Sequence, residues 1–195
     1  CTSDYPRRVS CFVPRRCGRL FLFEHLERLA MTHLRDIIIA LADAEVGFVI
    51  GGGVACVLQG VERFTLDLDV AVNLTSANLG KFISVMESQG LVPRVPVKPE
   101  SLLDPEVRRM IVEEKNALGF TFMDLKDPRR HVDMFLRDDL SFEAMNAESD
   151  RVELDGRPIK VASVGKMLEI KESIDPPRDK DLLDIAALKR LMNDG

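Results

Sequence analysis

Apolar positions along the chain change their spacing several times, and each change marks an expected element. From Leu20 to about Glu45 apolar residues recur at three- and four-residue steps, which predicts one or two helices. A short apolar run at 47–50 predicts a buried strand, and 66–70 alternates apolar and acidic residues, as a strand with two different faces does. Between these strands, Gly51-Gly52-Gly53 predicts a turn and 54–58 a short helix.

The second half of the chain continues the alternation of helices and strands. Further helices are expected at 79–88, 105–114, 163–173 and 178–192. Further strands are expected at 118–125, 131–136, 151–154 and 158–161. Asp155-Gly156 predicts a hairpin turn between the last two. Residues 91–97 also alternate, but Pro93 and Pro96 restrict such a strand to a sheet edge.

These elements predict an α/β (α+β) fold in a single domain at 19–195. Its core, about 35–162, is a short mixed β-sheet flanked by helices, and a C-terminal helical segment at about 163–193 is expected to close a cleft. Residues 1–18 contain four arginines and little periodicity, which predicts a disordered basic tail. A solvated tail is the favoured interpretation, and contact with RNA stays open.

Composition narrows the class of protein. A chain of 195 residues with 46% hydrophobic content suits one globular domain. The net charge of −5 excludes a generally basic, nucleic-acid-coating surface. No apolar run approaches the ~20 residues of a membrane span, and no signal peptide is evident. We expect a soluble, cytoplasmic protein. Of the four cysteines, only Cys56 lies outside the tail, and we expect it to be a buried small apolar residue.

Three aspartates are the candidate metal-binding residues. Side chains two apart on a strand share a face, so Asp67 and Asp69 point the same way. Asp133 lies alone among apolar residues in a later strand, and pairing of the strands would bring it beside them. Clustered carboxylates suit a hard cation such as Mg²⁺, completed by water and phosphate. Two such ions about 4 Å apart serve phosphoryl transfer.

The sequence resembles the DNA polymerase β-type nucleotidyltransferase superfamily. Gly52-Gly53 is followed by thirteen residues, by Asp67-Leu68-Asp69, and later by Asp133 in an apolar strand. The fuller pattern is similar to small AbiEii-type toxins and uncharacterised minimal bacterial nucleotidyltransferases. Its elements are Gly52, Gly53, Ala55, Gly60, Arg63, Thr65, Asp67 and Asp69. Where the superfamily often has Gly-Ser, this chain has Gly-Gly, so phosphate contacts at the turn would come from backbone N–H groups.

The C-terminal part extends this resemblance. The relatives tend to carry a lysine on one helix and R-x-K-D with a further acid on the next. The matching residues are Lys171, Arg178, Lys180, Asp181 and Asp184.

The resemblance implies a role for each residue. Asp67, Asp69 and Asp133 would hold two Mg²⁺ ions, or Mn²⁺ in their place, and Asp133 would also orient or deprotonate the acceptor. The residues expected to bind the nucleotide are Gly52, Gly53, Arg63, Thr65, Lys171 and Lys180.

Several of these residues also have plainer interpretations. Arg63 would equally pair with a nearby acid, and Thr65 needs no explanation beyond entering a strand. Surface helices carry lysines routinely. Asp181 and Asp184 would cap the helix, pair with Arg178 or touch the site, and pairing is the favoured interpretation. His131 shares the strand face of Asp133, where it would assist the acceptor or be structural. The turn with Lys126, Arg129 and Arg130 would meet a phosphate or simply be solvated.

The function implied by the resemblance is metal-dependent transfer of NMP from an NTP such as ATP to an acceptor hydroxyl, releasing pyrophosphate. A toxin-like enzyme would modify a tRNA 3′ end or a protein and would have a cognate antitoxin. The alternatives are a small-molecule, aminoglycoside-type nucleotidyltransferase and a catalytically silent relative that binds nucleotide or a partner.

Overall fold

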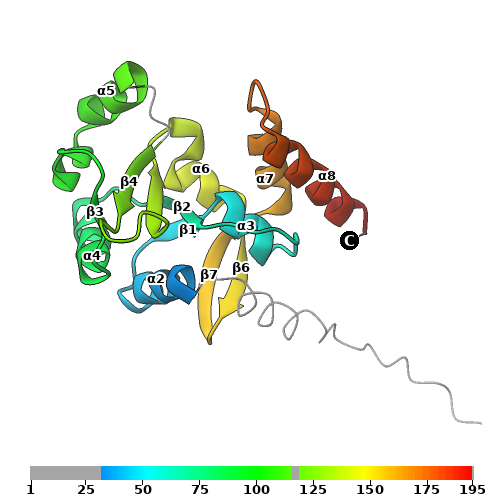
Figure 1. Ribbon diagram of the computed structural model, residues 1–195, viewed down its shortest axis with the longest axis horizontal. Coiled ribbons are helices and arrows are strands. Elements are labelled where there is room, and N and C mark those ends of the chain that lie inside the picture. Colours follow the sequence, from blue (N-terminus) through cyan, green and yellow to red (C-terminus); the bar gives the residue numbers. More distant parts are fainter. Residues whose placement is uncertain (1–31, 116–118, 195) are drawn as a thin grey trace, which may run out of the picture.

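The computed structural model describes residues 32–115 and 119–194. Its centre is a seven-stranded sheet with the order β3-β4-β5-β2-β1-β7-β6 (Figure 1). The strands are β1 (Phe48–Ile50), β2 (Asp67–Val72), β3 (Val92–Pro93), β4 (Gly119–Met123), β5 (His131–Phe135), β6 (Ser149–Leu154) and β7 (Arg157–Ala162). The sheet is mixed, as predicted, because β2 pairs with β5 and β1 with β7 in parallel, whereas the other neighbours are antiparallel.

Helices occupy both faces of this sheet. They are α2 (Thr32–Asp43), α3 (Gly52–Leu58), α4 (Ser76–Ser88), α5 (Pro105–Lys115), α6 (Phe142–Ala147), α7 (Val164–Glu172) and α8 (Asp179–Asp194), with short 3₁₀ helices η1 (Pro99–Leu103) and η2 (Asp138–Leu140). In Figure 1, α7 and α8 lie side by side at one side of the molecule, and α7 also packs on α3.

The two faces of the central strands differ in chemistry. Leu68 and Val132 are fully buried on the face that α2 and α4 cover, where Phe82 of α4 meets Phe122 of β4 edge to face at 5.5 Å. The opposite face carries the acidic residues of β2 and β5. The strands therefore bury one side in the core and leave the other to polar groups.

Most predicted elements are present. The edge strand at 91–97 is indeed at the edge, but pairs only over Val92–Pro93. Asp155 and Gly156 form the predicted hairpin turn, both at positive φ. Ser163 caps α7 through its side chain, and Cys56 is buried.

The sequence pattern did not predict α6, because its six residues are too few for a helical period to be visible. The expected tail at 1–18 and the first part of the helix from Leu20 lie outside the described residues. None of the described helices combines the length and apolar character that crossing a bilayer requires.

Candidate active site

Parallel pairing of β2 with β5 gathers the acidic residues. Asp69 pairs in register with Asp133, and Asp67 with His131. Ligand atoms of Asp67, His131 and Asp133 all lie within 4.8 Å of one another. The register therefore confirms two predictions. Asp67 and Asp69 lie on one face of their strand, and strand pairing brings Asp133 beside them.

The glycine turn fits closely around Asp69. Gly52 has φ +56°, and a Cβ built on it would lie only 1.7 Å from Asp69 Oδ2. The N–H of Gly53 donates to the Asp69 carboxylate, and the N–H of Gly51 donates to the Asp69 backbone oxygen at 2.9 Å. Gly52 is thus required both by its backbone conformation and by the carboxylate beside it.

The three carboxylates differ electrostatically. Burial, followed by the charges of Asp67 and Asp133, raises the pKa of Asp69 to about 7. Burial also acts to raise the pKa of Asp67, but hydrogen bonds from Thr65 and from its own backbone lower it below the ordinary value. Mutual repulsion at Asp69 is the interaction that a bound cation would remove.

Threonine hydroxyls orient two of the acids. Thr65 donates to Asp67 Oδ1 at 2.5 Å, in line with its predicted place near the site. Thr121 donates to Asp133 Oδ1 at 2.5 Å from the neighbouring strand β4. Sequence reasoning missed Thr121, because only the antiparallel register of β4 with β5 places it opposite Asp133.

His131 presents one ring nitrogen to this cluster. Its Nδ1 lies 3.1 Å from the carbonyl oxygen of Pro128, which can only accept, so Nδ1 carries the proton. Its Nε2 lies 3.9 Å from Asp133 Oδ2. Nε2 therefore faces the acids, where a neutral imidazole would offer it as a metal ligand.

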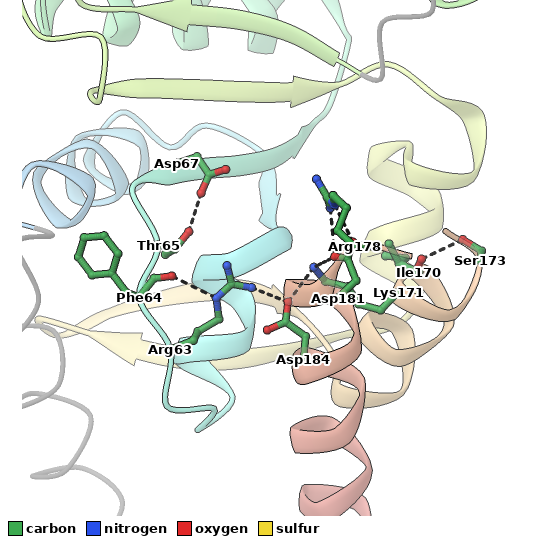
Figure 2. Close-up of polar contacts among 10 residues, drawn as sticks. All are labelled: Arg63, Phe64, Thr65, Asp67, Ile170, Lys171, Ser173, Arg178, Asp181 and Asp184. Carbon is green, nitrogen blue, oxygen red and sulfur yellow. Dashed lines mark hydrogen bonds and ion pairs between the residues drawn. The ribbon is translucent and has the colours of Figure 1, made fainter. Parts of the chain in front are cut away.

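A chain of ion pairs connects the strand-entry loop to α7 and α8 (Figure 2). Arg63 Nη1 contacts Asp184 Oδ2 at 2.5 Å, and Lys171 Nζ lies 2.8 Å from both Asp184 and Asp181. Asp181 also accepts from Arg178 Nε at 2.6 Å. We call these five residues the helix network. In this network Arg63 pairs with an acid and Asp181 pairs with Arg178, as their plainer interpretations expect, and a nucleotide-binding role for Arg63 stays a prediction.

The two predicted phosphate lysines have different surroundings. Lys171 is buried in the helix network, and its pKa is raised because hydrogen bonds and charges of Asp181 and Asp184 outweigh the effect of burial. Lys180 is exposed, and its charge is among the causes that lower the pKa of Asp67. Only Lys180 of the pair is therefore open to a ligand in this conformation.

The basic turn before β5 is largely neutralised. Arg129 pairs with Asp127 at 2.9 Å, and Arg130 pairs with Asp124 at 2.7 Å. The prediction that this turn could meet a phosphate considered its cations and not the acids that pair with them.

The donor set fits a hard divalent cation. Asp67 and Asp133 direct carboxylate oxygens to a common space, and Asp69 stands on the same strand face with a pKa raised by burial and then by its neighbours' charges. Oxygen ligands of this kind are the ones that Mg²⁺ prefers. The imidazole of His131 adds one nitrogen ligand that would also suit Mn²⁺.

Solved structures share this fold. The crystal structure of the lincosamide antibiotic adenylyltransferase LnuA with lincomycin bound has a TM-score of 0.57 and 18% identity, covering 84% of this chain and 98% of that one. The solution structure of the antibiotic-resistance factor ANT(2'')-Ia has a TM-score of 0.54 and 17% identity, covering 84% and 83%.

A third solved structure is also similar. An antigenic nucleotidyltransferase-like protein from Paracoccidioides brasiliensis has a TM-score of 0.51 and 15% identity, covering 84% and 78%. The sequence matches no protein-family model and no curated protein. The chain therefore has the nucleotidyltransferase fold of antibiotic adenylyltransferases, which confirms the predicted fold class.

Proposed function

We propose that this protein transfers a nucleoside monophosphate from an NTP to a hydroxyl group of a small-molecule acceptor, with Mg²⁺ and with release of pyrophosphate. One observation carries the proposal. Asp69 and Asp133 stand in register on adjacent parallel strands, with Asp67 beside them and the glycine turn against Asp69, in a fold shared with adenylyltransferases.

The proposed reaction assigns a task to each group. Asp67, Asp69 and Asp133 would hold Mg²⁺, which when bound neutralises phosphate charge and activates the acceptor oxygen. Asp133, oriented by Thr121, takes the acceptor's proton as that oxygen bonds to the α-phosphorus. The bond from the α-phosphorus to the β-phosphate oxygen breaks, and pyrophosphate leaves. Gly52, Gly53 and Lys180 contact the nucleotide in this proposal, whereas Lys171 and Arg63 stay paired within the helix network.

Two observations favour a small acceptor over tRNA. LnuA is a lincosamide antibiotic adenylyltransferase whose structure holds lincomycin, so the fold accommodates such a molecule. The basic turn that would have met an RNA backbone instead pairs Arg129 and Arg130 with acids. A polyanion would have to displace those carboxylates before gaining the same contacts.

The test is a transfer assay with Mg²⁺ and each NTP labelled at the α-phosphate. Acceptors are a panel of lincosamides and aminoglycosides, total tRNA, and protein. Wild type is compared with Asp67→Asn, Asp69→Asn and the matched surface change Asp36→Asn. We expect label on a small molecule, a loss of at least about a thousandfold in the first two variants, and full activity in Asp36→Asn.

Other outcomes identify the alternatives. Label on tRNA or protein would replace the small-molecule proposal with the toxin-like one. Nucleotide binding measured by calorimetry, with no labelled acceptor of any class, would indicate a catalytically silent relative.

A further inference from the structure

The helix network carries more positive than negative charge. Its cations are Arg63, Lys171 and Arg178, and its anions are Asp181 and Asp184. Three cations against two carboxylates leave one unbalanced positive charge. The network therefore has an excess cation that could meet a ligand, and burial decides which residue offers it.

Exposure distinguishes the three cations sharply. The side chain of Lys171 is 7% exposed and that of Arg63 is 15% exposed, whereas that of Arg178 is 58% exposed. Lys171 and Arg63 also direct their charged ends at Asp184. Arg178 alone among the three cations is accessible to solvent over much of its surface.

Asp181 fixes the direction of the Arg178 guanidinium. Arg178 Nε lies 2.6 Å from Asp181 Oδ2, and its Nη2 lies 3.0 Å from Oδ1, so the two planar groups meet in a fork. Asp181 is itself fully buried and held by Lys171. An exposed arginine with such a support has lost much of the rotational freedom that would oppose ligand binding.

The rest of the guanidinium lies on the side of the metal-binding acids. In Figure 2 the end of the Arg178 side chain extends past Asp181, to about the height of Asp67 in that view. The hydrogen bond that Arg178 donates to Asp181 is the main cause that raises the pKa of Arg178, and the charges of Asp69 and Asp67 add to it. Arg178 has five N–H groups, of which the fork uses only Nε and one on Nη2, so the others are available.

We propose that Arg178 binds the β- and γ-phosphates of the NTP, with Asp181 and Lys171 as the residues that position it. This inference rests on the proposed function and names the cation that recognises the leaving group. As the bond to the α-phosphorus breaks, the electron pair stays on the departing pyrophosphate, and the guanidinium neutralises part of that charge. Lys171, predicted to touch the triphosphate, acts instead through Asp181.

The test separates triphosphate recognition from general damage. Wild type, Arg178→Met and Arg178→Lys are titrated by calorimetry with AMP and with an ATP analogue whose α,β-bridge is methylene, each with Mg²⁺. Arg190→Met is the matched control, because it removes an exposed arginine from α8, the helix that Arg178 directly precedes. AMP lacks the two phosphates assigned to Arg178, so it reports on every other part of the site.

The expected result is a change in selectivity between the two ligands. Arg178→Met weakens binding of the ATP analogue at least about tenfold and leaves AMP binding within about twofold, since loss of a charge-assisted hydrogen bond costs about 1.5–3 kcal/mol. Arg178→Lys recovers part of the loss, because a point charge replaces a fork. Arg190→Met leaves both affinities unchanged.

Three results would overturn the assignment. They are equal weakening of AMP and the ATP analogue in Arg178→Met, no weakening of either, and loss of the preference for the ATP analogue in Lys180→Met instead. Failure of the proposed function looks different, because wild type would then bind neither ligand in a Mg²⁺-dependent way or would label no acceptor.

Discussion

Asp69 is the residue whose ionisation should respond most to metal. Its pKa of about 7 exceeds the ordinary aspartate value, so the folded chain binds this proton more tightly than the unfolded chain. Its contribution favours the folded state at low pH and is lost as the pH rises from about 4 to about 7. Asp67 and Asp181 have lowered pKa values and stay ionised above pH 5, so they do not compensate.

The first prediction therefore concerns pH and Mg²⁺ together. Without metal, the free energy of unfolding should fall by on the order of a few kcal/mol between pH 5.5 and 8 because of Asp69. Mg²⁺ should raise the melting temperature more at pH 8 than at pH 5.5, since at the lower pH it must displace the proton. Thermal melts of wild type and Asp69→Asn measure both effects. A pH dependence that persists unchanged in Asp69→Asn would contradict this account.

The second prediction concerns Gly52. Its positive φ and the Asp69 oxygen at 1.7 Å from a built Cβ leave no room for a side chain. Gly52→Ala should lower the free energy of unfolding by about 2 kcal/mol or more and abolish transfer, because backbone strain adds to displacement of Asp69. Chemical denaturation and the labelled-NTP assay measure the two effects.

Gly80 provides the matched control for this change. It lies within α4 with nothing within 4 Å of a built Cβ. Gly80→Ala should leave transfer intact and raise the free energy of unfolding by about 0.5–1 kcal/mol, because alanine favours the helix. Equal losses of stability and of transfer in the two variants would show that position 52 does not specifically require glycine.

At the level of elements, α8 is held by buried charges as well as by the buried side chain of Leu188. Asp184 is 3% exposed and contacts both Arg63 and Lys171, whereas Leu182 and Leu183 of the same helix are half or more exposed. Removing one charge from a buried cluster leaves its partners without compensation, which is costly. The docking of α8 is therefore sensitive to a single carboxylate.

The third prediction follows for Asp184→Asn. It should lower the free energy of unfolding by about 3 kcal/mol, and hydrogen exchange should accelerate first in α7 and α8. Glu172→Gln is the control, because Glu172 pairs with Lys189 at 2.7 Å on the surface, where such pairs contribute little. If exchange accelerates evenly over the whole chain, α8 is not a separately held unit.

Element by element, local signals in the sequence were sufficient for the positions of most strands and helices. Alternation at 66–70 and the apolar strand around Asp133 predicted the two strands that carry the acids, and Ser163 predicted the start of α7. The sequence could not predict that Thr121 lies beside Asp133, or which acids pair with Lys171. The register of distant strands and the packing of α8 determine these contacts, and neither produces a periodic pattern in the sequence.

At the scale of the whole molecule, charge bears on the acceptor. The net charge is −5, and the arginines of the turn before β5 have acidic partners. A polyanion gains affinity by releasing counterions from phosphates, which needs unpaired cations on the protein. Among the described residues, the paired arginines of this turn therefore favour a small acceptor over a long nucleic acid, and under the proposal above a single NTP would still contact Arg178.

The fourth prediction tests this balance. Total tRNA added at about physiological ionic strength should change the rate of transfer to a small acceptor by less than about twofold. Heparin serves as a second polyanion. Strong competition by tRNA but not by heparin would instead indicate a specific RNA site and favour the toxin-like acceptor.

Parallel pairing of β2 with β5 has a consequence for how the protein acquires its chemistry. Asp69 and Asp133 are far apart in sequence and meet only across that ladder, so local structure alone cannot assemble the acidic centre. Closing such a long loop is entropically costly, and contacts of this separation slow folding. Affinity for Mg²⁺ should therefore arise late in refolding, after most of the helical circular-dichroism signal has returned. The appearance of Mg²⁺ binding would then report that the sheet is complete.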